Sequence, residues 1–511
     1  MADSKSTASI FDSVVKFREI LTHIDRDYVD DVDTDKLVED AIGKMLEKLD
    51  PHSVYLPKSE VELAQSQLKG EFEGIGIEFI ILKDTIQVVA PLSGGPSERL
   101  GIMAGDKIIS VDGETVAGIG ITNRGVMDRL RGEKGTTVKV DIKRKGMKAL
   151  LNFAIIRDKI PQTSVDVHYM INAQVGYIRV SRFAATTYDE FKASLDDLLA
   201  KGMKKLILDL QTNPGGYMDR AINMADEFIS GNKMIVYTDG KGTRYDSEAR
   251  AYRQGVFEKG ALIVLINEGS ASASEIVSGA IQDNDRGLIV GRRSFGKGLV
   301  QMPIDLSDGS ELRLTISRYY TPSGRSIQKP YDENLDDYNQ DYMTRYEKGE
   351  FFHKDSIKFA DSLQYTTLKG RIVYGGGGIM PDYFVPFDTN ETSGYFSQLI
   401  YSNTLKEYSL DYLEKNKKKL AKMSLNDFKE NFEVTDDMVQ KLVKLGEENE
   451  VKLNQEELNR SKRLIKIHLK AFIARGIWES EGYFSIWNET NEALLKALEL
   501  LDEAEALANR K

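Results

Sequence analysis

Residues 267–276 of this 511-residue chain contain the hydroxyl groups that nucleophilic catalysis requires. Three serines alternate with alanines there, at Ser270, Ser272 and Ser274. The apolar run 261–266 precedes them and another apolar run follows, which predicts a strand, a turn and a helix. A serine at such a turn lies beside the free N–H groups of the first helical turn, which stabilise a developing negative oxygen. A serine N-cap followed by a close-packed helix also fits these residues.

A second segment supplies a base. Lys297 stands between Gly296 and Gly298, after the apolar residues 288–290. A lysine on an open surface does not need flanking glycines, whereas one lying beside another backbone does. It can accept a proton only when neutral, so burial would have to lower its pKa from about 10.4 to about 7–8, at a cost of about 4 kcal/mol. A solvated, phosphate-binding loop is the alternative, although Gly298 breaks the P-loop pattern.

Other nucleophiles and bases are scarce in the sequence. The chain has no cysteine, which excludes thiol nucleophiles, disulfides and cysteine-ligated metals. None of its five histidines lies in a glycine-rich turn of the α/β part, and no two have metal-ligand spacing. A serine–lysine pair is therefore the more economical prediction, with no metal and no cofactor.

A paired-glycine turn joins another predicted strand, residues 205–210, to a helix. It reads Asn213-Pro-Gly215-Gly216, and adjacent glycines allow backbone N–H groups to face the same site as the serine. A plain turn between a strand and a helix would also account for these residues.

The elements that must position these groups predict an α/β fold with helical ends. We expect an N-terminal helical region at 1–68, a small β-rich domain at 69–157 and a core of alternating strands and helices at 158–390. The core carries a polar insertion at about 326–374, and a C-terminal helical region follows at 391–511.

Composition excludes several classes of protein. With 69 Lys and Arg against 80 Asp and Glu, the net charge is −11, which disfavours a nucleic-acid partner. Hydrophobic residues make up 41% of the chain, enough for packed cores, and no run of eighteen apolar residues predicts a membrane span.

Four motifs in order resemble those of the C-terminal processing (tail-specific) peptidases, a serine–lysine protease family. They are LDLQTNPGG (208–216), SASASEI (270–276), FGKGLVQ (295–301) and YYTPSGRSIQ (319–328). LDPHSVYL (49–56) and GGIMPD (377–382) are also similar to family segments, so the resemblance covers about residues 10–390. It implies a crotonase/ClpP-like β-β-α protease core.

The resemblance assigns roles to individual residues. It implies that Ser272 is the nucleophile, because only this serine stands the family's twenty-five residues before the base, Lys297. Gln301 would orient the lysine. The oxyanion hole would use the N–H of Ala273 and one from Gly215 or Gly216. This sequence departs from the family at Gln211, where an arginine is usual, so we expect no salt bridge from that position.

Residues 72–77 resemble the carboxylate-binding loop of a PDZ domain, and glycine-containing segments up to Asp112-Gly113 match bacterial PDZ modules. Such a loop binds a terminal carboxylate through consecutive N–H groups, while a strand edge pairs with the peptide. Peptide binding is therefore expected at Gly74, Ile75, Gly76 and Ile77.

Together these features predict a serine endopeptidase that binds proteins by their C-terminal tails and cleaves through an acyl-enzyme. A catalytically silent PDZ adaptor and a crotonase-type acyl-CoA enzyme are the alternatives. The resemblance also implies a periplasmic or cell-envelope location and allows a homodimer. The first residues lack the apolar segment of a secretory signal, which fits either a cytoplasmic protein or one whose signal has been removed, and the resemblance implies the second.

Overall fold

The strands predicted at 205–210, 261–266 and 288–290 lie next to one another in a six-stranded sheet. The structure, a computed structural model, describes residues 3–92, 94–331 and 335–510. The strand order is β10-β11-β12-β15-β16-β21; the first pair is antiparallel and the others are parallel. The bounds are β10 (Val165–Met170), β11 (Val175–Val180), β12 (Lys205–Asp209), β15 (Ala261–Ile266), β16 (Leu288–Gly291) and β21 (Tyr383–Phe384).

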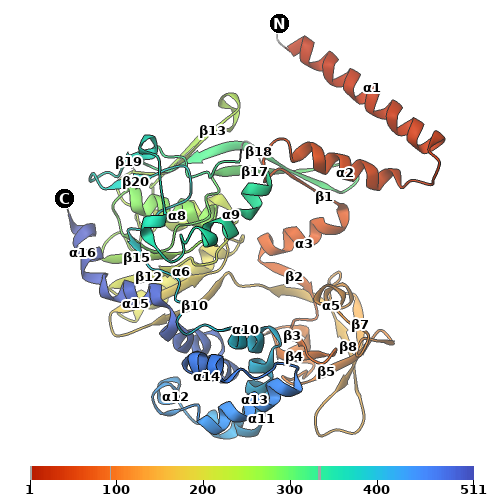
Figure 1. Cartoon of the computed structure of the whole chain (residues 1–511), viewed down its shortest axis with the longest axis vertical. Helices are drawn as coiled ribbons and strands as arrows, with labels where there is room; N and C mark the ends of the chain where they lie inside the picture. The colour runs from red at the N-terminus through yellow and green to blue at the C-terminus, as the bar shows by residue number, and fades with distance from the viewer. Residues whose placement is uncertain (1–2, 93, 332–334, 511) are drawn as a thin grey trace.

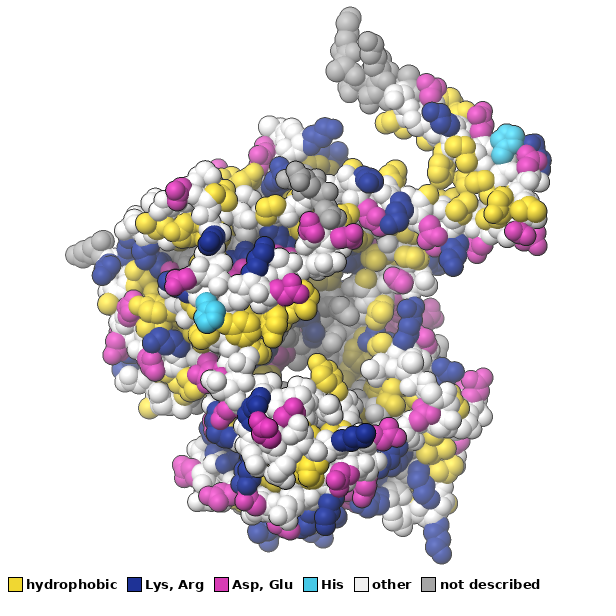
Figure 2. Space-filling model, in the orientation of Figure 1, with side chains coloured by type: hydrophobic (Ala, Val, Ile, Leu, Met, Phe, Trp, Pro, Cys, Tyr) yellow, Lys and Arg dark blue, Asp and Glu magenta, His cyan; other side chains and the backbone are white. Residues whose placement is uncertain are grey.

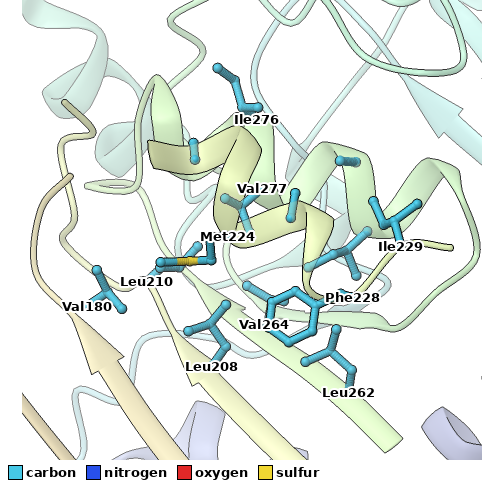
Figure 3. Packing of buried hydrophobic residues seen from close by; sticks show 14 of the residues in the cluster. Val180, Leu208, Leu210, Met224, Phe228, Ile229, Leu262, Val264, Ile276 and Val277 are labelled. Atoms are coloured by element: carbon cyan, nitrogen blue, oxygen red, sulfur yellow. The ribbon is translucent and has the colours of Figure 1, made fainter. Parts of the chain in front are cut away.

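Helices cover both faces of this sheet (Figure 1), as expected for a sheet whose strands are apolar on both sides. On one face lie α6 (Thr187–Ala200), α7 (Met218–Asp226) and α8 (Ala273–Asp283), and on the other α15 (Glu492–Glu499) and α16 (Leu501–Asn509). Figure 3 shows the first of these interfaces, where Leu208 and Val264 of the sheet pack near Met224 of α7, Val277 of α8 and Phe228, which follows α7. Every residue of α8 is buried, so this helix is held on all sides.

A second, antiparallel sheet packs against α7 and α8 and brings together segments that are distant in the sequence. Its strands are β1 (Val54–Leu56), β18 (Glu311–Tyr320), β13 (Met234–Gly240) and β14 (Ser247–Arg250), and β17 (Leu299–Asp305) pairs with β18. The N-terminal part, predicted to be helical, thus contributes a strand, because the three residues of β1 pair with β18. Because β17, which follows Lys297, pairs with the other edge of β18, β1 lies one strand away from it.

A small antiparallel sheet follows the N-terminal helices in the chain. It contains β3 (Ile77–Ile81), β4 (Ile86–Pro91), β5 (Lys107–Val111), β7 (Thr137–Lys143) and β8 (Leu151–Ile156), with β6 (Glu114–Thr115) beside β5. Helices α4 (Pro96–Arg99) and α5 (Asn123–Leu130) accompany it, and its apolar side chains form a separate core. Strands β2 (Glu71–Gly74) and β9 (Asp158–Pro161) pair where the chain enters and leaves this unit.

Residues 335–374 pack against the protease-like core. They form α9 (Leu335–Glu347) and the hairpin of β19 (Gln364–Thr366) and β20 (Ile372–Tyr374). Tyr338, Arg345 and Phe351 are buried, and Arg345 donates to the carbonyl oxygens of residues 293 and 294.

The C-terminal helices form a further core. They are α10 (Gly394–Tyr401), α11 (Thr404–Leu420), α12 (Leu425–Asn431), α13 (Asp436–Glu448) and α14 (Gln455–Trp487), which is interrupted by non-helical dihedral angles at Trp478 and Glu479. Ion pairs between Arg475 and Glu78 and between Lys145 and Glu414 join these helices to the small sheet.

At the N-terminus, α1 (Asp3–Asp27) extends away from the rest of the molecule, followed by α2 (Thr34–Leu46) and α3 (Lys58–Lys69) (Figure 1). Apolar side chains are exposed along α1 (Figure 2), among them Ile10, Phe11, Val14, Phe17 and Ile20. No helix within the described ranges has both the length and the apolar character needed to cross a bilayer.

Candidate active site

Ser272 lies at the turn between β15 and α8, as the sequence predicts. It is the N-cap residue of α8 and has φ 55° and ψ −113°, an unfavourable backbone conformation for a residue with a side chain. Its two neighbouring serines are fully buried, and their hydroxyls donate to carbonyl oxygens, Ser270 to Leu210 and Ser274 to Asn213. Ser272 is partly exposed. Of the three serines, it is therefore the one placed to meet a substrate.

Lys297 lies in the loop before β17, and its two flanking glycines are explained by close backbone contacts. A Cβ atom on Gly296 would lie 3.0 Å from the Gly378 nitrogen, and one on Gly298 would lie 3.0 Å from the Gln328 nitrogen. Burial lowers the pKa of the Lys297 ammonium, although the negative charges of Glu275 and Asp50 oppose this shift. The neutral amine is thus easier to form here than in water.

Glu275 and Tyr319 join the backbones of Ser272 and Lys297. Oε2 of Glu275 accepts the N–H of Ser272 at 2.8 Å and that of Lys297 at 2.9 Å. The Tyr319 hydroxyl lies 3.1 Å from the carbonyl oxygen of Ser272 and 2.5 Å from that of Lys297. Both residues are almost completely buried. The candidate nucleophile and base are therefore fixed side by side through their main chains.

The other oxygen of Glu275 holds the lysine loop. Oε1 accepts the hydroxyl of Ser294 at 2.5 Å and the N–H of Gly296 at 2.7 Å. Burial nevertheless raises the pKa of this carboxyl group to about 7, against the opposing effect of its hydrogen bonds. The role of Glu275 was missed from the sequence, although the Ser-x-x-Glu spacing at 272–275 is that of a capping box and could have indicated it.

Gln301 lies at the start of β17, where it contacts a polar network instead of the lysine. Its Nε2 donates to Thr315 Oγ1 at 3.1 Å, and Thr315 donates to Asp50 at 3.0 Å. Among the described residues, no hydrogen bond joins the side chain of Lys297 to that of Ser272 or Gln301. The structure thus brings the three predicted residues to one place without bonding their side chains directly.

The paired-glycine turn lies directly against the turn of Ser272. A Cβ atom on Gly215 would come within 2.8 Å of Ser272 Cβ and 2.9 Å of the Ala273 nitrogen. The N–H of Gly215 donates to Asn213 Oδ1 at 2.9 Å. Over the residues that the structure describes, the N–H groups of Gly216 and Ala273 donate to no other atom. These two groups are free to bind an oxygen near Ser272.

His52 is a second residue whose position the sequence did not indicate. Its Nε2 lies 2.6 Å from the hydroxyl of Tyr338. Burial and, second, the charge of Lys297 lower the pKa of the His52 imidazole to about 4, which leaves it neutral at pH 7. Asp50, two residues earlier, accepts the N–H of His52 at 2.8 Å. The segment LDPHSVYL therefore forms part of the wall beside Lys297.

Arg179, on the neighbouring strand β11, forms a salt bridge with the strand end that precedes Gln211. Its Nη1 lies 2.7 Å from Oδ2 of Asp209, which is fully buried. Asp209 in turn accepts the N–H of Gln211 at 2.8 Å. A guanidinium thus supports this turn from another position in the sequence.

The loop predicted to bind a carboxylate joins β2 to β3. Gly76 has φ 71°, which favours glycine, and Ser97 fixes the loop by donating its hydroxyl to the carbonyl oxygen of Ile75 at 2.6 Å. The N–H of Ile75 takes part in the antiparallel bridge between Gly74 and Arg131, whereas within the described ranges the N–H of Gly76 forms no hydrogen bond. Strand β3, where Ile77 lies, is at the edge of its sheet. An extended peptide could therefore pair with it.

Two further findings concern other sites. A cavity of about 940 Å³ lies between residues 354–382 and α16; its lining includes Gln282, near the end of α8 that is remote from Ser272.

In the part of the chain that the structure describes, no group of three His, Asp or Glu side chains could hold a metal ion.

Family comparisons match successive parts of the chain. The matches are to the "Activating protease CtpB N-terminal domain" (residues 1–60), a PDZ domain (74–155), peptidase family S41 (174–335) and a family of unknown function (395–479). The chain is thus a serine-type peptidase with a PDZ domain.

Similar proteins define the family more closely. The carboxy-terminal-processing protease of Bartonella bacilliformis is 38% identical over 335 residues, 64% of this chain and 76% of that protein. The carboxy-terminal processing protease CtpB of Bacillus subtilis is 35% identical over 337 residues, 64% of this chain and 67% of that protein. A solved photosystem II D1 C-terminal processing protease is 30% identical, with 61% of this chain and 89% of that chain covered and a TM-score of 0.35. The chain belongs to the carboxy-terminal processing proteases, which confirms the resemblance noted in the sequence.

Proposed function

We propose that this protein is an endopeptidase that binds protein C-termini with its PDZ domain and cleaves with a Ser272–Lys297 dyad. The observation that carries the proposal is the joint fixing of both residues by Glu275 and Tyr319, which holds nucleophile and base in one geometry. Family membership and the lowered pKa of Lys297 support it further.

In the proposed reaction, the neutral amine of Lys297 takes the hydroxyl proton of Ser272 as the oxygen attacks the carbonyl carbon of the peptide bond. The resulting oxyanion accepts hydrogen bonds from the N–H groups of Ala273 and Gly216, at the positive end of α8. The lysine ammonium then protonates the leaving amine, and the acyl-enzyme forms. Water, deprotonated by Lys297, hydrolyses the ester and restores the serine.

Gln301 has a more indirect part in this proposal than the sequence suggested. It orients the wall beside Lys297 through Thr315 and Asp50. Gly215 positions the turn, because its N–H is already donated to Asn213, and Gly216 provides the second oxyanion contact.

Substrate tails bind, we further propose, at Gly74, Ile75, Gly76 and Ile77. The N–H of Gly76 suits an oxygen of a terminal carboxylate, and the open edge of β3 suits the preceding residues of the tail. The bound tail would deliver a more distant peptide bond to Ser272.

The wider organisation is proposed on the same basis. The parallel strands β11, β12, β15 and β16 with intervening helices support a crotonase/ClpP-like core at 158–390, between a PDZ domain at 69–157 and helical regions at 1–68 and 391–511. The apolar stripe on α1 supports a homodimer. The bacterial origin of the relatives supports a periplasmic or cell-envelope location.

The dyad is tested by cleavage of an unfolded protein and by binding of a fluorescent C-terminal peptide. Ser272→Ala, Lys297→Ala and Lys297→Arg should each abolish cleavage, because arginine keeps the charge but cannot become neutral. Ser274→Ala, which removes a buried structural hydroxyl, should retain cleavage. All variants should bind the tail peptide as the wild type does.

The same assays separate the alternatives. A wild-type protein that binds tails but cleaves nothing would be the silent adaptor. Undiminished cleavage by both Ser272→Ala and Lys297→Ala would overturn the proposed dyad.

A further inference from the structure

In the C-terminal helical region, the end of α14 and the residues that follow it contact the side chains that hold the paired-glycine turn in place. We propose that Arg179 is a positioning residue for residues 211–216, here called the oxyanion loop, and that residues 484–491 of the C-terminal region hold it in place. This inference rests on the proposed function, because it assumes that the oxyanion loop supplies an N–H to the reacting carbonyl.

Arg179 binds the oxyanion loop at two points besides its ion pair with Asp209. Its Nη2 lies 3.3 Å from the carbonyl oxygen of Gln211 and 3.2 Å from the hydroxyl of Thr212. The planar guanidinium can serve Asp209 and the loop at once, which a single ammonium could not do equally well. Arg179 therefore fixes both the strand end and the start of the loop.

The loop needs such support because its backbone is unfavourable over several residues. Thr212 has φ 58°, and the two glycines have φ 97° and 142°. A Cβ atom on Gly216 would clash with the carbonyl oxygen of Phe183. Conformations of this kind persist only where surrounding contacts impose them.

Three side chains of residues 484–491 reach this network. The ring of Phe484 lies under the Arg179 guanidinium, with 5.4 Å between the guanidinium carbon and the ring centroid. Asn488 donates to the Tyr169 hydroxyl at 2.8 Å, and Tyr169 packs against Tyr177, whose hydroxyl lies 2.5 Å from Asp209 Oδ2. Gln211 Nε2 lies 3.4 Å from Asn491 Oδ1.

These contacts converge on one turn from a segment more than 270 residues later in the chain. The apolar face of Phe484 limits the orientations of the guanidinium, which then fixes the loop N–H groups relative to Ser272. The C-terminal region thereby becomes part of the active-site framework, although none of its residues touches the substrate.

The experiment uses the full-length protein and compares Arg179→Met, Arg179→Lys and Phe484→Leu. The control Phe472→Leu removes a ring of the same size from the same helix, where it packs against Tyr483 and not against Arg179. For each variant, kcat and KM are measured with a tailed peptide, together with the rate at which a fluorophosphonate labels Ser272 and the melting temperature.

Because small displacements of a positioned group cost up to about 100-fold in rate, Arg179→Met should lower kcat about 10- to 100-fold, with KM within about threefold. Arg179→Lys should recover part of this loss. Phe484→Leu should lower kcat and the labelling rate about three- to tenfold, whereas Phe472→Leu should leave both within about twofold.

An unchanged kcat in Arg179→Met would overturn the inference, as would equal losses in Phe484→Leu and Phe472→Leu. If Arg179→Met does not fold, Arg179→Lys and Phe484→Leu decide the question in the same way. Active Ser272→Ala would instead refute the proposed function. Inactive Ser272→Ala together with fully active Arg179 and Phe484 variants would refute this inference alone.

Discussion

At the scale of single residues, the candidate site depends on a buried acid that is not itself part of the proposed dyad. Glu275 binds the main chains of Ser272 and Lys297, so its carboxylate fixes their spacing more firmly than their own side chains do. Its negative charge also favours the lysine ammonium, and burial of Lys297 outweighs that effect, since the pKa of the lysine is lowered. Desolvation therefore prevails over charge attraction at this site.

Replacement of Glu275 by glutamine should lower kcat by about 10-fold or more, because the amide presents donors where two N–H groups need an acceptor.

The pKa of the Glu275 carboxyl group, raised from 4.5 to about 7 in the wild type, also has a consequence for stability. The folded state binds the proton more tightly than the unfolded state, so this group's contribution to stability is present at low pH and is lost as the pH rises from about 4.5 to about 7. Urea unfolding at several pH values should show that Glu275→Gln removes this decrease in the free energy of unfolding between about pH 4.5 and about pH 7.

The matched control is Glu268→Gln, which removes a partly buried carboxylate of the β15–α8 turn that pairs with Arg292, a residue that follows β16. It should leave kcat close to the wild-type value. Equal kcat in the wild type and Glu275→Gln would show that the carboxylate does not position the dyad.

At the scale of elements, turns place the functional groups and helices and strands hold the turns. The β15–α8 turn presents Ser272, and the β12–α7 turn presents Gly216 at the same edge of the parallel sheet. Neighbouring parallel strands end at the same edge, so two turns that follow them meet there. The loop from β2 to β3 is built differently: its shape depends on Gly76, which has a left-handed backbone conformation, and it leads into β3 at the open edge of a sheet.

The β2–β3 loop gives a prediction about tail binding. Gly76→Ala introduces a Cβ at φ 71° and 2.9 Å from Ile160 Cδ1, so the loop must move away from the shape that is proposed to bind a carboxylate. Fluorescence anisotropy should show the Kd of a C-terminal peptide rising about 10-fold, which corresponds to about 1.4 kcal/mol. Labelling of Ser272 by a fluorophosphonate should be unaffected.

Gly146→Ala provides the comparison, since Gly146 also has positive φ, at 82°, but has open space around its Cβ position and lies in another turn of the same domain. Its peptide affinity should remain that of the wild type. Equal weakening in both variants would attribute the effect to lower domain stability and not to the loop.

At the scale of the whole molecule, contacts between the parts differ in strength. The last two helices are packed on the core sheet by apolar side chains. The PDZ domain instead meets the C-terminal helices partly through exposed or half-exposed ion pairs such as Arg475 with Glu78. Each pair of this kind contributes only about 0–1 kcal/mol. The PDZ domain is thus held less firmly than the C-terminal end.

The projecting helix α1 leads to a prediction about assembly. Val14 is 61% exposed and Phe17 is 44% exposed, on the same face as Ile10. Burial of this stripe against a second copy would remove it from water, so the wild type should be a dimer. Val14→Asp/Phe17→Asp should be monomeric in sedimentation equilibrium.

Lys16→Asp changes the net charge by the same two units on a different face of α1, and it should remain dimeric. A wild-type protein with the mass of a single chain at all concentrations would contradict the prediction. So would dissociation by Lys16→Asp to the same extent, which would indicate a charge effect.

The sequence by itself determined the local parts of this protein. Apolar runs such as 261–266 and 205–210 are sufficient to predict buried parallel strands, because burial on both faces needs only a short apolar segment. The serine turn, the lysine between glycines and the paired glycines are equally local, since each reflects the conformation of a few adjacent residues. The family was recognisable from these motifs, and the comparisons confirm it.

Only the tertiary structure decided which residues support the reacting groups. Glu275 bridges Ser272 and Lys297, and His52 comes beside Lys297 because β1 pairs with β18. Arg179 supports the turn at Gln211 from the neighbouring strand, through Asp209. Periodicity and turn chemistry act over a few residues, whereas a hydrogen-bond partner is set by where distant segments cross. For that reason the sequence was sufficient to propose Ser272 and Lys297 as the reacting groups, and only the packed fold revealed their partners.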